Sequence, residues 1–330
     1  MVISKYKRDG SSGVNFKDIK GQESVKRALE IACAGGHNAS LFGPPGSGKT
    51  LLARSMISIL PDITEEEALE VTKIYSIAGE LDKKSPFIVE RPFRTPHHST
   101  SRPGLLGGGN PISPGEISLA HYGVLFIDEF PELERGIIES LRQPLENHEI
   151  SISRAQGSLT FPANFMFVIA SNPCPCGNLG NPKKECTCYR MQIKKYQDKL
   201  SGPIIDRIDL HIRCSPVDLA KLSDQKDAEN SMVVKLRVQR ARDLQQERYK
   251  DLQGVRCNAD LDASNIGAFC SLGLNEQSFM TSAANKLVLS ARSYHKILKV
   301  SRTISDLEEN GEITVNHISE ALQYRFSGFS

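Results

Sequence analysis

Long hydrophobic runs are missing from this sequence of 330 residues. The longest wholly apolar run away from the termini covers residues 165–170, whereas a helix needs ~20 apolar residues to cross a bilayer. The first residues, MVISKYKRDGSSG, hold no apolar stretch of the length found in secretory signal peptides. We therefore expect no membrane partner and a cytoplasmic location.

An excess of charge of one sign is missing as well, because 41 lysines and arginines face 39 aspartates and glutamates. The formal net charge of +2 does not indicate a nucleic-acid partner, so only a local patch of basic residues could indicate one. Repeats and low-complexity segments are absent, and a content of 39% hydrophobic residues is ordinary for a soluble globular protein. The length predicts about two domains.

A phosphate-binding loop is predicted by SLFGPPGSGKT, residues 40–50, which matches G-x-x-x-x-G-K-[ST] at every fixed position. A loop that points successive backbone N–H groups at phosphate needs the backbone freedom of glycine. Lys49 is expected to reach the β- and γ-phosphates of ATP, and Thr50 to bind Mg²⁺, where a helix begins. The alternative is a glycine-rich turn without a ligand. The predicted nucleotide-binding residues are Gly43, Pro44, Pro45, Gly46, Ser47, Gly48, Lys49, Thr50 and Leu51.

Two further strand-like segments end in polar residues and alternate with helical stretches, which predicts an α/β fold with a parallel sheet. YGVLFIDEF, residues 122–130, places Asp128 and Glu129 at the carboxyl edge of that sheet, where such folds bind ligands. Asp128 is expected to hold Mg²⁺ and Glu129 to orient the attacking water. FMFVIASNP, residues 165–173, brings Asn172 to the same edge, either to contact the γ-phosphate or to cap a turn.

Arg207 lies between two acidic residues in SGPIIDRIDLHI, residues 201–212. One subunit's arginine can be offered to the nucleotide of the next subunit as an arginine finger. The structural alternative is an ion pair with Asp206 or Asp209 at the surface, which stabilises a fold little.

The eight cysteines are spread unevenly, and four of them are scattered residues expected to be buried, reduced thiols. The other four crowd into NPCPCGNLGNPKKECTCY as two C-x-C pairs, Cys174 with Cys176 and Cys186 with Cys188. Two thiol pairs on a flexible loop can form a tetrahedral site for structural Zn²⁺. A redox pair or four idle thiols is the alternative.

A basic patch follows the cysteines. Residues 183–199 carry six lysines and arginines and two carboxylates, and Lys194 and Lys195 stand among the cations. Tyr189 and Tyr196 lie between these charges and can stack on unpaired bases. A DNA-binding surface and a solvated basic face are both consistent with this composition.

A longer ordered set of motifs accompanies these residues, and it resembles the ComM/YifB family. Members are bacterial AAA+ ATPases similar to the magnesium-chelatase ATPase subunit and, more distantly, to MCM helicases. The resemblance runs from about Phe16 to Arg325, nearly the whole chain. It rests on the phosphate-binding loop and on GQESVKRALEIACAGGHN, PFRTPHHST, GGGNPISPGEISLAHYGVLFIDEF, LRQPLENHEISISRAQGSLTFPANF, NPCPCG, SGPIIDRIDLHI, LSARSYHKILKVSRTISDL and ALQYR.

The resemblance implies an AAA+ P-loop NTPase core, with a parallel sheet sandwiched by helices, followed by a small all-α lid domain. It implies ATP and Mg²⁺ as cofactors, a homo-oligomeric ring, expected to be a hexamer, and DNA, single-stranded or branched, as partner. Family members act as helicases that promote branch migration when transforming DNA is integrated. The implied roles are Walker A for Lys49 and Thr50, Walker B for Asp128 and Glu129, sensor 1 for Asn172, arginine finger for Arg207 and sensor 2 for Arg292.

The domain organisation follows from the same resemblance and from a shift in composition after Pro216. We expect a tail at 1–15, the AAA+ domain at 16–215, a helical linker at 216–256 that leads away from the core, and a lid at 257–330. The AAA+ domain is expected to contain a helix-2 insert at about 91–118, a presensor hairpin at about 149–162 and a cysteine-rich loop at 173–190. Arg154 in the hairpin is expected to meet DNA phosphate in a central pore, and the alternative is an exposed arginine on a hairpin without a ligand.

Three classes of function are consistent with these features. The leading one is an ATP-driven DNA motor. The second is a chelatase-type ATPase subunit that drives metal insertion through a partner protein, and the third is a nucleotide-binding scaffold without motor activity. Family members usually carry a Lon-like domain ahead of this core, so we expect a truncated product, a fragment or a natural short form.

Overall fold

The computed structural model describes residues 13–82, 86–154, 157–181, 184–200, 202–216, 229–326 and 328. Residues 1–12 of the predicted tail and residues 217–228 of the predicted linker lie outside this range. Within the described residues, no helix is both long and apolar enough to cross a bilayer.

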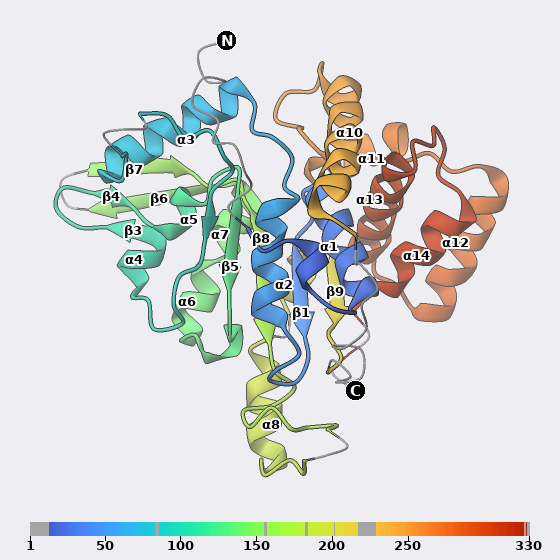
Figure 1. The fold of residues 1–330 in the computed structure, drawn as a ribbon, viewed down its shortest axis with the longest axis horizontal. Coiled ribbons are helices and arrows are strands. Elements are labelled where there is room, and N and C mark those ends of the chain that lie inside the picture. The colour runs from blue at the N-terminus through green and yellow to red at the C-terminus, as the bar shows by residue number, and fades with distance from the viewer. Residues whose placement is uncertain are drawn as a thin grey trace.

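A five-stranded sheet stands at the centre of the larger part of the chain, in the strand order β2-β5-β8-β1-β9 (Figure 1). Every neighbouring pair is parallel, so the carboxyl ends of all five strands meet at one edge. The strands are β1 (Ala39–Phe42), β2 (Phe93–Arg94), β5 (Val124–Ile127), β8 (Met166–Ser171) and β9 (Leu210–Arg213).

The central strands are buried on both faces, as a parallel sheet between helices requires. Val124 and Phe126 of β5 belong to one hydrophobic cluster, and Leu125 and Ile127 belong to another. Successive residues of a strand point to opposite faces, so this alternation produces three layers. The first cluster includes residues of α1 (Glu23–Gly35), α10 (Ser231–Tyr249) and α13 (Ala291–Leu307), and the second includes residues of α6 (Arg135–Ser140). The predicted α/β fold class is confirmed.

The described residues from 229 onward form helices and no strand, as predicted for the C-terminal part. Besides α10 and α13 they include α11 (Ala263–Phe269), α12 (Leu274–Leu287) and α14 (Val315–Gln323). One expectation is wrong: α10 packs on α1 and does not lead away from the core. The reason is an apolar stripe on this charged helix, where Val234, Val238 and Ala241 are buried.

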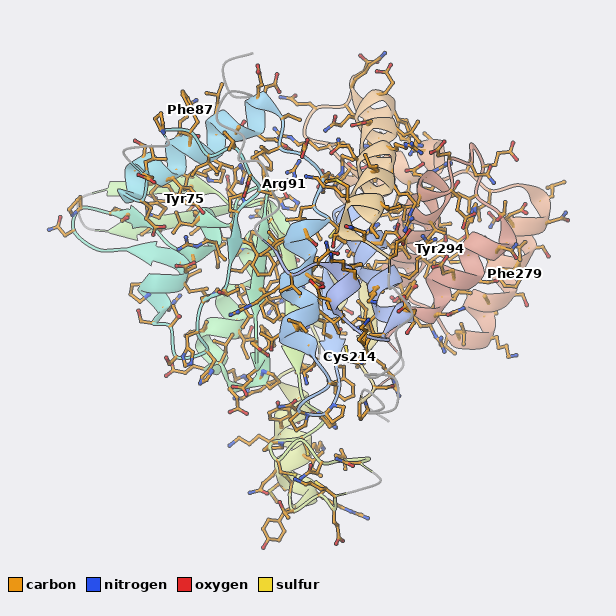
Figure 2. The ribbon with its side chains drawn as sticks, viewed as in Figure 1. Tyr75, Phe87, Arg91, Cys214, Phe279 and Tyr294 are labelled. Carbon is orange, nitrogen blue, oxygen red and sulfur yellow. The ribbon has the colours of Figure 1, made fainter. Side chains whose placement is uncertain are left out.

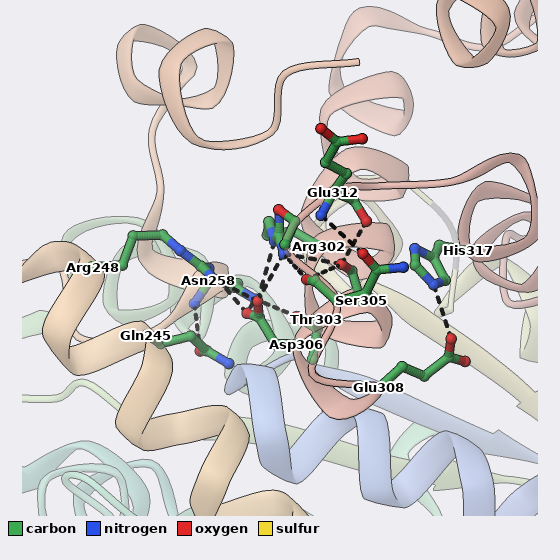
Figure 3. Close-up of polar contacts among 12 residues, drawn as sticks. Gln245, Arg248, Asn258, Arg302, Thr303, Ser305, Asp306, Glu308, Glu312 and His317 are labelled. Carbon is green, nitrogen blue, oxygen red and sulfur yellow. Dashed lines mark hydrogen bonds and ion pairs between the residues drawn. The ribbon is translucent and has the colours of Figure 1, made fainter. Parts of the chain in front are cut away.

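A buried polar network ties the C-terminal helices together (Figure 3). The Asp306 carboxylate on α13 accepts hydrogen bonds from Arg248 on α10, from Asn258 on the 3-10 helix η6 (Asn258–Asp260), and from Arg302 one turn earlier. These contacts fix α10, η6 and α13 relative to one another.

Both predicted insertions form local structure on one side of the sheet (Figure 1). The helix-2 insert contains a small hairpin, and residues 149–162 contain a second hairpin whose first and last residues, Glu149 and Pro162, lie opposite each other. Ile150, Ile152 and Phe161 are buried, whereas the side chain of Arg154 lies outside the described residues. The elements are α4 (Arg102–Leu106), β3 (Gly107–Gly108), β4 (Ser113–Pro114), α5 (Glu116–Leu119), β6 (Glu149–Arg154) and β7 (Gly157–Pro162).

Candidate nucleotide-binding site and cysteine cluster

The predicted phosphate-binding loop connects β1 to α2 (Lys49–Ser55). Gly46 and Gly48 adopt left-handed backbone conformations with φ of 76° and 80°, which glycine accepts at low cost. Gly43 is required for a different reason, since a Cβ there would lie 2.2 Å from the carbonyl oxygen of Cys214. Cys214 follows β9 and is labelled in Figure 2. The glycines thus serve both the curvature of the loop and its close approach to the neighbouring strand.

Lys49 points back into this loop. Its Nζ donates hydrogen bonds to the carbonyl oxygens of Gly43 at 2.8 Å and Pro44 at 2.9 Å, and to Asn172 Oδ1 at 3.0 Å. The side chain is buried, and burial lowers the pKa of its ammonium while the charge of Asp128 and other neighbours opposes that shift. The structure therefore brings the predicted Walker A lysine and the predicted sensor residue into direct contact.

Thr50 and Asp128 also meet. Thr50 Oγ1 donates to Asp128 Oδ2 at 2.5 Å, and the other carboxylate oxygen accepts from the Glu129 amide at 2.9 Å. The hydroxyl and the carboxylate present adjacent oxygen ligands of the kind that Mg²⁺ prefers.

Glu129 occupies a left-handed conformation with φ of 50°, uncommon for a residue other than glycine. Its side chain is half exposed, and its Oε2 lies 3.4 Å from His98 Nδ1. His98 comes from the predicted helix-2 insert, so this insert reaches the acidic end of β5. Strained backbone of this kind occurs often at functional sites.

Arg207 is buried, and it pairs with neither Asp206 nor Asp209. Its guanidinium contacts the Glu146 carboxylate of α7 (Arg142–Asn147), and Arg292 Nη2 of α13 lies 4.0 Å from the same carboxylate. The predicted finger and the predicted sensor 2 arginine therefore share one acidic partner.

The terminal nitrogens of the Arg207 guanidinium are occupied, because Nη1 donates to the carbonyl oxygen of Pro203 and Nη2 contacts Glu146. Its Nε has no hydrogen-bond partner among the described residues. Burial lowers the pKa of Arg207, and the charges of Arg292 and Arg142 act in the same direction.

The four clustered cysteines converge, with all sulfur atoms within 4.8 Å of one another. Cys174 Sγ lies 3.5 Å from Cys176 Sγ and 3.6 Å from Cys186 Sγ. Four sulfurs bound tetrahedrally at 2.3 Å would be ~3.8 Å apart, so the spacing fits a structural zinc site. The Cys176 amide donates to Cys188 Sγ at 3.4 Å, which is the outer hydrogen bonding that supports thiolate ligands.

Part of the basic patch forms the helix α8 (Arg190–Asp198). This helix projects from the body of the molecule together with the cysteine loop (Figure 1). Lys194, Lys195 and Tyr189 are exposed. Tyr196 is buried at 6% exposure, so the expectation that it stacks on bases is wrong. Its hydroxyl is hydrogen-bonded to the backbone of Asn172, which follows β8. Lys183 lies outside the described residues.

Two residues at the site were not predicted to be functional, although both lie in motifs that carry the resemblance. Gln22 donates through Nε2 to the carbonyl oxygens of Ser47 at 3.4 Å and Ser215 at 2.6 Å, bracing the phosphate-binding loop. The Glu146 carboxylate lies within ion-pair distance of both Arg207 and Arg292. The identity of a glutamine or glutamate does not by itself indicate its partner, and only the folded chain shows what it contacts.

A parallel sheet with a phosphate-binding loop after β1, an acidic end on β5, a polar end on β8 and a following helical domain defines an AAA+ P-loop protein. The model of the family described as magnesium chelatase, subunit ChlI, matches residues 15–222, and the model of its C-terminal part matches residues 228–325. The chain belongs to this family.

Curated relatives agree with this assignment. The chain is 44% identical over 318 residues to "Competence protein ComM" of Haemophilus influenzae, an alignment that covers 96% of this chain and 61% of that protein. It is 42% identical over 312 residues to "Uncharacterized protein YifB" of Escherichia coli, covering 94% of this chain and 60% of that one. The chain thus spans about three fifths of these relatives. The resemblance inferred from the motifs is confirmed.

A more distant relative comes from the chelatases themselves. The chain is 28% identical over 233 residues to "Magnesium-chelatase 67 kDa subunit" of Heliobacterium mobile, covering 58% of this chain and 35% of that protein.

Proposed function

We propose that this chain is the ATP-hydrolysing part of a ring-forming AAA+ motor that acts on DNA. The observation that carries the proposal is the convergence of Lys49, Thr50, Asp128 and Asn172 at the carboxyl edge of the sheet. In AAA+ proteins this edge binds ATP with Mg²⁺, and the metal ion neutralises charge on the phosphates.

The side chains of the site support a division of tasks. Lys49 hydrogen-bonds backbone carbonyls and Asn172, and phosphate oxygens are stronger acceptors for the same ammonium. Thr50 and Asp128 would hold Mg²⁺, and Glu129 would orient the attacking water. His98, within reach of Glu129, would help to hold that carboxylate in place.

Arg207 and Arg292 are proposed to act together on the nucleotide of a neighbouring copy. They contact a common carboxylate in this chain, so one movement of Glu146 would free both guanidiniums. A finger arginine is worth ~10³ or more in rate, because it stabilises charge that develops on the transferred phosphoryl group. Hydrolysis would then require a ring, proposed to be a hexamer.

The DNA partner is supported by the similarity to a relative named a competence protein, and by the exposed cations of α8. We propose a helicase that promotes branch migration during natural transformation, with Arg154, Lys194 and Lys195 contacting phosphate. The match to chelatase models keeps an ATPase that drives metal insertion through a partner as the second candidate. A scaffold without turnover is the third.

One assay separates the three candidates. ATPase activity is measured with and without single-stranded DNA, for the wild type and for Glu129→Gln. A DNA motor predicts stimulation of the wild type, together with nucleotide binding but no turnover in the variant. Hydrolysis unaffected by DNA would favour the chelatase function, and absence of hydrolysis in assembled rings would favour the scaffold.

Zinc is proposed at the cysteine cluster on the basis of its sulfur spacing. The ion would bind Cys174, Cys176, Cys186 and Cys188 and supply folding energy to the loop. Metal analysis of protein purified without added metal should find about one zinc per chain. Protein without zinc or another soft metal would refute the site.

A further inference from the structure

The cysteine loop packs directly on the phosphate-binding loop. A Cβ added at Gly177 would lie 2.5 Å from Pro45 Cδ and 2.8 Å from its Cγ, so a side chain there would displace one of the two loops. Gly177 also has a φ of 78°, which places it in the left-handed region. It follows the second cysteine, Cys176, in the chain, so the position of the cluster and the position of Pro45 are linked.

A second connection runs through the end of β8. Asn172, whose Oδ1 accepts from Lys49, is separated from Cys174 by one residue, Pro173. Gln197 of α8 donates to the Pro173 carbonyl oxygen at 3.0 Å, and Cys174 is fully buried. A shift of Cys174 would therefore change the position of Asn172.

A third connection reaches the end of β5. Lys199, just after α8, donates through Nζ to the carbonyl oxygens of Pro131 at 2.6 Å and Leu133 at 3.2 Å. These residues follow Glu129 in and after the 3-10 helix η4 (Phe130–Glu132). The segment that contains the cysteines and α8 thus contacts three parts of the nucleotide site.

We propose that metal binding at the four cysteines and nucleotide binding at the phosphate-binding loop are energetically coupled. The bound metal fixes the loop that carries Gly177 and Cys174, and that loop holds Pro45 and Asn172 in the arrangement that binds nucleotide. Without metal the four thiols offer only weak S–H contacts, which cannot hold a glycine-rich loop in one conformation. This proposal rests on the proposed function, since it assumes that nucleotide binds at Lys49.

Coupling of this kind is reciprocal, so each ligand must strengthen the other by the same factor, ~5-fold or more. The affinity for a fluorescent ADP analogue is measured in zinc-loaded and in zinc-depleted protein. The zinc affinity is measured by competition with a chromophoric chelator, with and without ADP. We expect ADP affinity to fall on zinc removal, and zinc affinity to rise with ADP by the same factor.

A pair of glycine variants tests the contact itself while the zinc stays bound. Gly177→Ala forces a side chain against Pro45, whereas Gly180→Ala meets no atom within 4 Å. Both positions have nearly the same left-handed φ, 78° and 76°, so the backbone strain of the two substitutions is matched. We expect Gly177→Ala to keep zinc and lose ~5-fold or more of its ADP affinity, and Gly180→Ala to bind both as the wild type does.

The outcomes distinguish the proposed coupling from the proposed function on which it rests. Zinc-loaded protein that binds no nucleotide would refute the proposed function and the coupling together. Nucleotide affinity that is the same with and without zinc, or the same in the two glycine variants, would overturn the coupling and leave the nucleotide site intact. Circular dichroism of the zinc-depleted protein checks that the remainder stays folded.

Discussion

The substitution Asp306→Ala tests whether the buried Asp306 carboxylate holds the C-terminal helices together. The Asp306 side chain is fully buried and accepts from Arg248 Nη1 at 3.0 Å and Nη2 at 2.5 Å, from Asn258 Nδ2 at 2.9 Å and from Arg302 Nε at 3.1 Å (Figure 3). Removing the carboxylate leaves two guanidiniums without their shared anion. Breaking one side of a buried ion pair costs ~3–5 kcal/mol of unfolding free energy.

Two features of the network place the expected cost at the lower end of that range. Arg248 is 23% exposed and can turn toward water. Arg302 is more deeply buried but keeps the carbonyl oxygens of Gly311 at 2.9 Å and Asn310 at 2.8 Å. We therefore expect Asp306→Ala to lower the free energy of unfolding by ~3 kcal/mol.

Urea unfolding followed by circular dichroism at 222 nm measures this loss, since the sequence contains no tryptophan for fluorescence. Glu247→Ala is the matched control, because it removes an exposed carboxylate of α10 that lies 2.6 Å from Lys250. Exposed pairs contribute little, so the control should change stability by no more than ~0.5 kcal/mol. Equal effects of the two variants would refute the argument that the buried carboxylate holds these helices together.

Three further predictions concern subunit contacts, DNA and pH. Arg207→Ala should bind ATP but not hydrolyse it. Mixing it with Lys49→Ala subunits should restore some activity, because mixed rings contain interfaces with one intact Lys49 and one intact Arg207. Inactive mixtures, in rings shown to contain both variants, would exclude a role of Arg207 at the neighbouring subunit's nucleotide. Lys194→Gln with Lys195→Gln should weaken DNA binding and reduce its salt dependence, with no comparable change when two exposed lysines of other helices are replaced. Burial, aided by the charge of Lys296, lowers the pKa of His211 to about 4. Below pH ~6.5 the unfolded chain therefore binds more protons at this histidine than the folded chain does, so the free energy of unfolding should decrease as the pH falls from there to about 4. Urea unfolding at several pH values should show a less steep decrease for His211→Gln than for the wild type.

The arrangement of the candidate nucleotide-site residues was predictable from the sequence because its requirements are local. The phosphate-binding loop needs glycines at fixed spacing, a lysine and a hydroxyl where a helix begins, and all of these stand within one short segment. Asp128 and Asn172 were predictable for a related reason, since both follow apolar strand-like runs. Parallel strands bring their carboxyl ends to one edge whatever lies between them in the chain.

The tertiary structure alone decided the contacts between distant segments. Tyr196 is buried and Tyr189 is exposed, although both stand among the same basic residues, because burial depends on which face of α8 packs on the rest of the chain. The partner of Arg207 is Glu146 of another helix, although acidic residues flank the arginine in the sequence. The approach of Gly177 to Pro45 arises because β1 and β8 pair side by side and their following loops leave the same edge. Such contacts depend on the packing of whole elements, which no short motif encodes.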